Sequence, residues 1–329
     1  MFQRFTRGIS SGKKVAVTCP GQGALYKGLL APYVKYRPVF QEYLSEIDEA
    51  LQENFSEKLL NRDTNHTKEF LTKTSRAQPA IVATTYIINQ LLKKVHGVDL
   101  FQENGISYVL GHSLGEYSAL LLSGGIDLYT AMQLVHQRGV LMEHLTQGEN
   151  GMTALIFRPQ HFSRVCAVAQ QRRVLANINS EQQVAISGRL AEIQEAVEEL
   201  NASSKIIMRQ ISLPTTIPFH NKVLDQIEPE LLKYLDREKD PIVPQIMNLT
   251  AAPKTGKRLR LIIEANSKPV RWNESLKLLS EKGVTDVVNL GPGDLLKAFM
   301  ARFPFRNHSV DSLESMKELR TYLYTNKEF

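Results

Sequence analysis

The chain of 329 residues contains little that would mark a specialised class of protein. It has two cysteines, Cys19 and Cys166, which are too few for a disulfide scaffold or a cysteine-ligated zinc site and fit a reducing compartment. No stretch approaches the ~18 consecutive apolar residues of a membrane-spanning helix. The glycine, proline and charged contents are ordinary, which excludes collagen-like, disordered and coiled-coil proteins. The sequence therefore predicts a folded protein with one or two domains.

Acidic residues are absent from the beginning of the chain, where Glu42 is the first. The first fourteen residues instead carry four basic side chains: Arg4, Arg7, Lys13 and Lys14. The net charge of +6 therefore belongs mainly to this segment and does not indicate a nucleic-acid partner. We expect residues 1–14 to be a mitochondrial transit segment, which would place the protein in the matrix. The alternative is a disordered basic tail.

Short apolar runs alternate with helical patterns over most of the chain. The runs typical of buried strands lie at residues 15–19, 108–110, 246–249 and 284–290, and the helical patterns at about 39–60, 78–93 and 130–145. Strands that alternate with helices predict a parallel sheet. We therefore expect an α/β fold whose large, α/β-hydrolase-like domain comprises residues 15–150 and 216–329.

The segment from residue 151 to 215 follows a different order. Its patterns read strand, helix, strand, strand, helix, strand, which is the arrangement of a ferredoxin-like domain. We expect this small subdomain to be inserted into the large one. A crevice between two such bodies is a natural site for a ligand.

The strongest chemical signal is the run Gly111-His112-Ser113-Leu114-Gly115, a G-x-S-x-G motif between a predicted strand and a predicted helix. In that context the serine occupies a strained turn that only flanking glycines allow, and its hydroxyl is presented as a nucleophile. The N–H of Leu114, at the start of the helix, would face a developing oxyanion.

A second loop, Pro20-Gly21-Gln22-Gly23, follows the first predicted strand. Loops at the carboxyl ends of parallel strands build the sites of open α/β sheets, so a backbone N–H near Gln22 is a candidate second oxyanion donor. The alternatives are an ordinary turn or a weakly specified phosphate loop.

Arg138 lies on the apolar face of the predicted helix 130–145. A buried guanidinium requires an anion, which leaves two alternatives: a core ion pair, or a clamp for a substrate carboxylate. Among eight histidines, His220 is the best candidate for a general base, because it lies where the chain re-enters the large domain beside the predicted crevice.

From about residue 15 to 303 the chain resembles the malonyl-CoA:acyl-carrier-protein transacylases of fatty acid synthesis. The matching motifs are PGQG at 20–23, AQPA at 77–80, GHSLGEYSAL at 111–120, RGVLM at 138–142, GMTALI at 151–156, ANINSEQQVAISG at 176–188, PFH at 218–220, PVRW at 269–272 and GPG at 291–293. Their common order makes a chance match implausible.

The resemblance implies a malonyl transfer from malonyl-CoA to the phosphopantetheine thiol of acyl carrier protein. Ser113 would carry the malonyl group as an ester, His220 would act as base and then acid, and Arg138 would pair with the malonyl carboxylate. The reaction would be ping-pong, without a metal or redox cofactor. Backbone N–H groups of Gln22 and Leu114 would form the oxyanion hole.

The resemblance also assigns supporting roles. Asn177 or Asn179 would support the site from the small subdomain. Phe219 would restrict the space beside the α-carbon and favour malonyl over methylmalonyl groups, although it could equally be a core residue. Three positions depart from the family pattern: Ala265, beside Asn266, stands where a glutamine is usual, Asn221 where a serine or cysteine is usual, and Cys19 where a phenylalanine is usual.

Four basic residues surround Gly256 and are candidates for docking an acidic carrier protein: Lys254, Lys257, Arg258 and Arg260. A solvated loop is the alternative. We expect a monomer without a nucleic-acid partner. The competing functions are a serine hydrolase or thioesterase, an acyltransferase of other specificity, and a catalytically inactive binding subunit.

Overall fold

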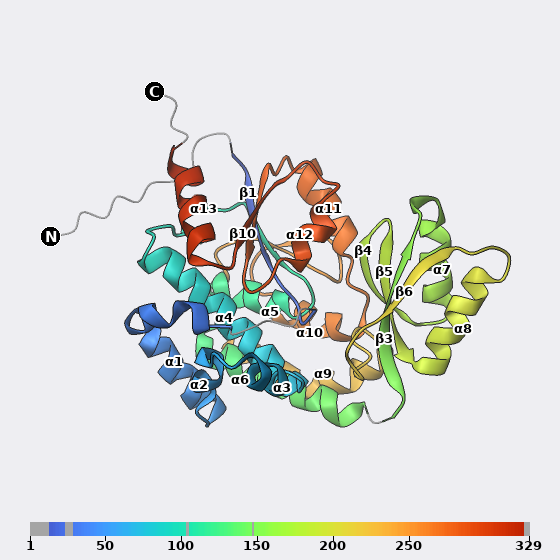
Figure 1. Ribbon diagram of the computed structural model, residues 1–329, viewed down its shortest axis with the longest axis horizontal. Coiled ribbons are helices and arrows are strands. Elements are labelled where there is room, and N and C mark those ends of the chain that lie inside the picture. Colours follow the sequence, from blue (N-terminus) through green and yellow to red (C-terminus); the bar gives the residue numbers. More distant parts are fainter. Residues whose placement is uncertain (1–12, 24–28, 103–104, 147, 326–329) are drawn as a thin grey trace.

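The computed structural model describes residues 13–23, 29–102, 105–146 and 148–325, so nearly all of the expected transit segment, residues 1–14, lies outside the described residues. The described chain forms a large body around a six-stranded sheet and a smaller one around a four-stranded sheet (Figure 1). Within these residues, no helix has both the length and the apolar character needed to cross a membrane.

The six-stranded sheet has the order β10-β9-β1-β2-β7-β8, and all neighbours are parallel except β7 and β8. Its strands are β1 (Val15–Cys19), β2 (Tyr108–Gly111), β7 (Gln245–Ile246), β8 (Pro253–Lys254), β9 (Asp286–Leu290) and β10 (Arg306–Val310). The predicted α/β fold with a parallel sheet is therefore confirmed.

Helices cover both faces of this sheet. They are α1 (Arg37–Leu51), α2 (Phe55–Leu60), α3 (Thr64–Phe70), α4 (Thr74–Lys94), α5 (Gly115–Leu122), α6 (Leu128–Leu145), α9 (Glu228–Leu232), α10 (Leu259–Glu264), α11 (Trp272–Glu281), α12 (Leu295–Met300) and α13 (Leu313–Thr325). Alternate β1 side chains point to opposite faces: Val17 joins the core with α4, α5 and α6, whereas Ala16 joins the core with α11 and α12. Burial on both faces explains why β1 is apolar throughout.

Two expected regions have different bounds in the structure, and the sheet also contains β8 and β10, where no strand was expected. The helical region at 39–60 is split into α1 and α2, because Gln52 ends α1 in the left-handed conformation with φ of 54°. The strand expected at 246–249 ends at Ile246, because the backbone N–H of Asn248 donates to the Glu116 side chain of α5 and its side chain donates to the carbonyl of Gly111, so that Asn248 does not extend the sheet.

The four-stranded sheet is antiparallel, with the order β4-β5-β3-β6. Its elements follow one another as β3 (Asn150–Phe157), α7 (Phe162–Gln171), β4 (Leu175–Ser180), β5 (Gln183–Arg189), α8 (Leu190–Asn201) and β6 (Ile207–Ser212). This is the predicted ferredoxin-like order, and α7 and α8 share one apolar core with the sheet. Figure 1 shows this unit on the right of the large body.

Backbone hydrogen bonds join the edge of the four-stranded sheet to the segment that precedes α11 in the large body. The N–H of Val270 donates to the carbonyl of Ala176 at 2.9 Å, and the N–H of Ile178 donates to the carbonyl of Val270 at 2.8 Å. Asn177 therefore lies on a strand whose edge is fixed to the large body.

Candidate active site

The site lies where β1 and β2 end side by side. Cys19 and Gly111, the last residues of these strands, are partners in the sheet, so the Pro20–Gly23 loop and the turn at Ser113 leave the same edge. This is the carboxyl edge of the parallel strands, where sites of open α/β sheets form. A cavity of about 150 Å³ opens there between the large and small bodies.

Ser113 occupies the strained turn that the G-x-S-x-G motif predicts. Its φ is 55°, in the left-handed region that side chains other than glycine rarely adopt. A Cβ on Gly111 would lie 1.8 Å from the carbonyl carbon of Gly115, and a Cβ on Gly115 would lie 2.2 Å from the carbonyl oxygen of Cys19. Both glycines are therefore required by the close passage of the backbone.

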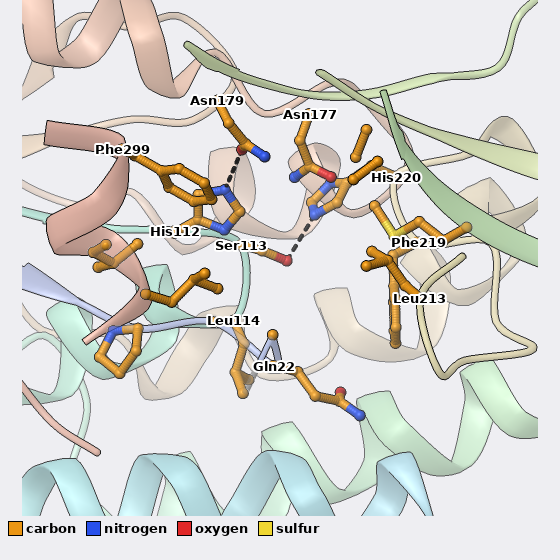
Figure 2. A pocket seen from close by; sticks show the side chains of 18 of the residues that line it. Gln22, His112, Ser113, Leu114, Asn177, Asn179, Leu213, Phe219, His220 and Phe299 are labelled. Carbon is orange, nitrogen blue, oxygen red and sulfur yellow. Dashed lines mark hydrogen bonds between the residues drawn. The ribbon is translucent and has the colours of Figure 1, made fainter. Parts of the chain in front are cut away.

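Ser113 and His220 are in direct contact (Figure 2). The Ser113 hydroxyl donates to Nε2 of His220 at 2.6 Å. On the other side of the ring, Nδ1 lies 3.0 Å from the carbonyl oxygens of both Ala265 and Lys268. Carbonyls only accept hydrogen bonds, so Nδ1 carries the proton and Nε2 is free to accept one from the serine. The pair is a dyad oriented by backbone carbonyls.

The environment keeps His220 neutral. Burial is the largest cause that lowers its pKa, to about 3, and the positive charge of Arg138 acts in the same direction, while the bonds to the backbone carbonyls oppose it. A neutral imidazole beside a serine hydroxyl can take up its proton at any pH near neutrality. The family departure at Ala265 leaves this arrangement intact, because the contact is made by the backbone.

The backbone around Ser113 is held by a residue that the sequence analysis did not identify. Asn248 accepts the Ser113 N–H through Oδ1 at 2.8 Å and donates through Nδ2 to the carbonyl of Gly111 at 2.6 Å. The N–H of Asn248 in turn donates to Oε1 of Glu116 at 2.8 Å. No motif marks Asn248, which lies 135 positions from Ser113.

The Ser113 N–H is thus engaged, and the neighbouring N–H groups are the ones that can face a ligand. Leu114 is the N-cap residue of α5, where the first N–H groups have no partner within the helix. Gln22 lines the same cavity from the Pro20–Gly23 loop, and its side chain donates to Thr74 at 3.1 Å, which fixes the loop against α4. Figure 2 shows both residues below Ser113.

Glu116 is fully enclosed behind the turn. Burial raises its pKa to about 8, while the bond from Asn248 and the charge of Arg138 oppose the shift. Burial therefore favours the neutral form of this carboxyl group, although the positive charge of Arg138 favours the ionised form.

Arg138 reaches the cavity from α6 and is 2% exposed. Its Nε donates to Oδ1 of Asn266 at 2.8 Å, and its guanidinium lies 5.2 Å from the ring centre of Tyr117. Burial lowers its pKa, and nearby Tyr117 and Glu116 oppose that shift. The partner found for Nε is an amide and not an ionised carboxylate, which favours the clamp over the core ion pair.

The small subdomain closes the other side of the cavity. Asn177 and Asn179 line it from β4, and Oδ1 of Asn179 lies 2.9 Å from Nε2 of His112 (Figure 2). Burial lowers the pKa of His112. Phe219 also lines the cavity, beside Leu213, and is 9% exposed.

The structure thus brings every predicted site residue to one cavity: Gln22, Ser113, Leu114, Arg138, Asn177, Asn179, Phe219 and His220. Cys19 is fully buried behind it, and burial strongly raises the pKa of its thiol, so it is no rival nucleophile. Among the described residues, no group of three or more histidine, cysteine or acidic side chains could hold a metal ion.

The prediction that Arg258 takes part in docking is wrong. Arg258 is 1% exposed, and its guanidinium donates to the carbonyls of Gly256 and Val243. It therefore fixes the interior of the loop. Lys254, Lys257 and Arg260 are exposed.

Comparison with known proteins agrees with this architecture. Residues 17–317 match the model of the acyl transferase domain family. The chain is 32% identical over 300 residues to the malonyl CoA-acyl carrier protein transacylase of Bacillus subtilis (strain 168), covering 88% of this chain and 90% of that protein.

Two solved structures are also similar to this chain. The acyl carrier protein S-malonyltransferase of Vibrio cholerae O1 biovar eltor is 29% identical, with a TM-score of 0.82 over 93% of this chain and 100% of that one. A malonyl-transacylase solved in complex with its type II PKS acyl-carrier protein is 26% identical, with a TM-score of 0.82 over 95% and 100% of the two chains. The family match over most of the sequence, together with these likenesses, shows that the chain belongs to the acyl transferase family and, within it, to the malonyl-CoA:acyl-carrier-protein transacylases.

Proposed function

We propose that this protein transfers a malonyl group from malonyl-CoA to the phosphopantetheine thiol of acyl carrier protein, through an ester on Ser113, as a step of fatty acid biosynthesis. The observation that carries the proposal is the 2.6 Å contact between Ser113 and His220 in a cavity that also contains the buried Arg138. The named activity of the relatives supports the choice of substrates.

In the first half-reaction, the Ser113 oxygen attacks the thioester carbonyl carbon while Nε2 of His220 takes its proton. The oxyanion that forms is stabilised by the N–H groups of Leu114 and Gln22. The intermediate collapses with cleavage of the carbon–sulfur bond. The proton on Nε2 passes to the departing sulfur, so that free CoA leaves and malonyl-Ser113 remains.

The second half-reaction is the same chemistry with a new thiol. His220 takes the proton of the phosphopantetheine thiol, and the sulfur attacks the ester carbonyl. The Ser113 oxygen leaves and recovers the proton from Nε2. Because one site handles both half-reactions, CoA must leave before the carrier thiol enters, which gives ping-pong kinetics.

Arg138 and Phe219, which also line the cavity, would select the acyl group. Arg138 offers planar, paired N–H donors that match a carboxylate, and burial strengthens such a contact relative to water. The bulk of Phe219 limits substituents on the α-carbon. Asn177 and Asn179 support the cavity wall from β4.

For the carrier protein we propose that the exposed basic residues Lys254, Lys257 and Arg260 contribute to docking, without the buried Arg258. Acidic partners approach such a surface faster at low salt, because charge complementarity acts mainly on the association rate. A salt-sensitive KM for the carrier, lost in a Lys257→Glu/Arg260→Glu variant with an unchanged KM for malonyl-CoA, would support this surface.

The decisive experiment is intact-mass spectrometry after brief mixing with malonyl-CoA, followed by holo acyl carrier protein. The expected result is a malonyl adduct on Ser113 that moves to the carrier, and no adduct in Ser113→Ala. Free malonate without carrier labelling would identify a hydrolase instead. Labelling by acetyl-CoA but not malonyl-CoA would overturn the role of Arg138.

We further propose that the protein acts as a monomer in the mitochondrial matrix. The acid-free basic composition of residues 1–14 supports the location. Fusion of the first forty residues to a fluorescent protein tests it, with Arg4→Glu/Arg7→Glu as the control expected to abolish mitochondrial fluorescence. Light scattering of the purified chain tests the oligomeric state.

A further inference from the structure

Asn266 lies between two residues of the site and contacts both. Its Oδ1 accepts the bond from Nε of Arg138 at 2.8 Å, and its Nδ2 donates to the hydroxyl of Tyr117 at 3.0 Å. The Tyr117 ring lies against the guanidinium at 5.2 Å. All three residues are buried, at 3%, 2% and 1% exposure respectively. The arrangement holds the guanidinium at Nε and places its carbon within cation–π distance of the tyrosine ring.

The bond to Nε determines which donors of Arg138 remain. A guanidinium can grip a carboxylate either through Nε and one terminal nitrogen, or through its two terminal nitrogens. Because Asn266 occupies Nε, a carboxylate from the cavity would bind through the terminal nitrogens, beside the hydrogen bond between Arg138 and Tyr117. Asn266 therefore selects the mode in which the carboxylate binds through the terminal nitrogens of Arg138.

The same short turn also orients the base. Asn266 is the middle residue of the 3-10 turn Ala265–Ser267, and the carbonyl of Ala265 accepts the bond from Nδ1 of His220. One rigid turn thus fixes both His220 and Arg138. The turn therefore sets the distance between Nε2 of His220, which takes the proton, and the guanidinium of Arg138, which would bind the carboxylate of the acyl group.

A purely structural role does not explain why an amide side chain occupies position 266. A polar side chain buried in a core is costly unless it is fully bonded, and an apolar residue of similar size would fill the same space without that cost. Here both ends of the amide are used, one on the guanidinium that lines the cavity and one on the tyrosine beside it.

We propose that Asn266 is a specificity-determining positioning residue, which acts with Tyr117 to hold Arg138 in the orientation that binds an acyl group ending in a carboxylate. This inference rests on the proposed malonyl transfer. It predicts that the loss of Asn266 weakens selection of malonyl over acetyl groups and spares the Ser113–His220 chemistry.

The test compares kcat/KM for malonyl-CoA and acetyl-CoA in the wild type and in Asn266→Leu. A hydrogen bond to a charged group is worth enough that the malonyl-to-acetyl ratio should fall about 10- to 100-fold, mainly through the KM for malonyl-CoA. Tyr117→Phe keeps the ring and removes the hydroxyl, and a smaller fall in the same ratio is expected. Melting temperatures are measured for every variant.

Two controls separate positioning from stability. Asn201→Leu removes another amide acceptor, the one that bonds the Ile207 N–H in the small subdomain, and should leave the ratio unchanged. In an Arg138→Ala background, Asn266→Leu should cause no further change in the ratio, because the residue acts through Arg138.

The outcomes are distinguishable. A wild type that forms no malonyl enzyme overturns the proposed function itself. A malonyl-forming wild type whose ratio is retained in Asn266→Leu and Tyr117→Phe overturns only the inference. So does an equal loss of malonyl and acetyl transfer that follows the melting temperature in both variants. If Asn266→Leu does not fold, the malonyl-to-acetyl ratio of kcat/KM in Tyr117→Phe tests the inference.

Discussion

Asn248 and Ser113 are joined by a 2.8 Å hydrogen bond from the backbone N–H of the serine to the side-chain oxygen of the asparagine. The other end of the same amide donates to the carbonyl of Gly111. Asn248 therefore spans the tight turn on both sides of His112. The φ of 55° at Ser113 is unfavourable for a side chain, and such a conformation persists only where the surroundings fix it.

We expect Asn248→Ala to release this turn and misplace the nucleophile. Displacements of ~1 Å at a reacting group can reduce rates by about 100-fold, so kcat should fall by 10- to 100-fold with a smaller change in KM. Stopped-flow measurement of the malonylation step checks this. A wild-type malonylation rate combined with a lowered melting temperature would show that Asn248 serves stability alone.

Arg138→Ala should abolish selection for the carboxylate. We expect kcat/KM for malonyl-CoA to fall by about 100-fold or more, which is typical when a buried charged partner is removed, while transfer from acetyl-CoA is retained or increased. Arg138→Lys should recover little of the loss, because an ammonium lacks the paired planar donors. An unchanged malonyl-to-acetyl ratio in Arg138→Ala would reject the clamp.

The pH dependence of acylation should lack an inflection near 6.5, the usual pKa of histidine. His220 is held neutral because its pKa is lowered to about 3, so the base is available throughout the pH range from 8 down to 5. Single-turnover malonylation across this range checks the expectation. A rate that halves near pH 6.5 would show that His220 titrates as an exposed histidine does.

The same burial has a consequence for stability. Between pH 6.5 and about 3 the unfolded chain binds a proton on His220 that the folded protein does not, so His220 should lower the free energy of unfolding as the pH falls through this window. His220→Gln should weaken that dependence. Urea unfolding at several pH values measures it.

Glu116 should give the free energy of unfolding the opposite pH dependence, so that the protein loses stability as the pH rises. Its folded pKa of about 8 exceeds the usual value of 4.5, so the folded protein holds a proton that the unfolded chain loses, and stability should fall as the pH rises from 4.5 to 8. Glu116→Gln keeps an oxygen to accept the Asn248 N–H and carries no charge. We expect it to be more stable than the wild type at pH 8 and equally stable at pH 4, by urea unfolding.

Phe219→Ala should widen the cavity next to the α-carbon of the acyl group. We expect kcat/KM for methylmalonyl-CoA to rise relative to malonyl-CoA by about 10-fold, the scale on which one methyl group is discriminated in an apolar pocket. Competition between the two thioesters, followed by mass spectrometry of Ser113, measures the ratio. An unaltered ratio would assign Phe219 to the core.

The sequence was most informative where local backbone geometry and function coincide. A Cβ on Gly111 would collide with Gly115, four positions away, so this part of the motif predicts the turn from local contacts, whereas Gly115 is required by the carbonyl of Cys19 at the end of β1. The succession of strands and helices in the small subdomain likewise follows from the succession of its sequence patterns.

The contacts that the sequence did not reveal are long-range and made by single polar side chains. Asn248 and Asn266 lie 135 and 128 positions from the residues they hold, and their neighbours in the sequence do not indicate these partners. Arg258 was misplaced for a related reason. A basic cluster in a loop predicts exposure, but one member turned inward, where backbone carbonyls accept its donors.

The carbonyls that orient His220 belong to Ala265 and Lys268, late in the chain, whereas Ser113 belongs to its first half. During synthesis, a chain that ends before residue 265 already contains the serine but has no means of holding the imidazole against it. The pairing of Ser113 with His220 therefore depends on a segment that the ribosome produces late, and we expect a protein truncated before residue 265 to be inactive even though it retains both side chains.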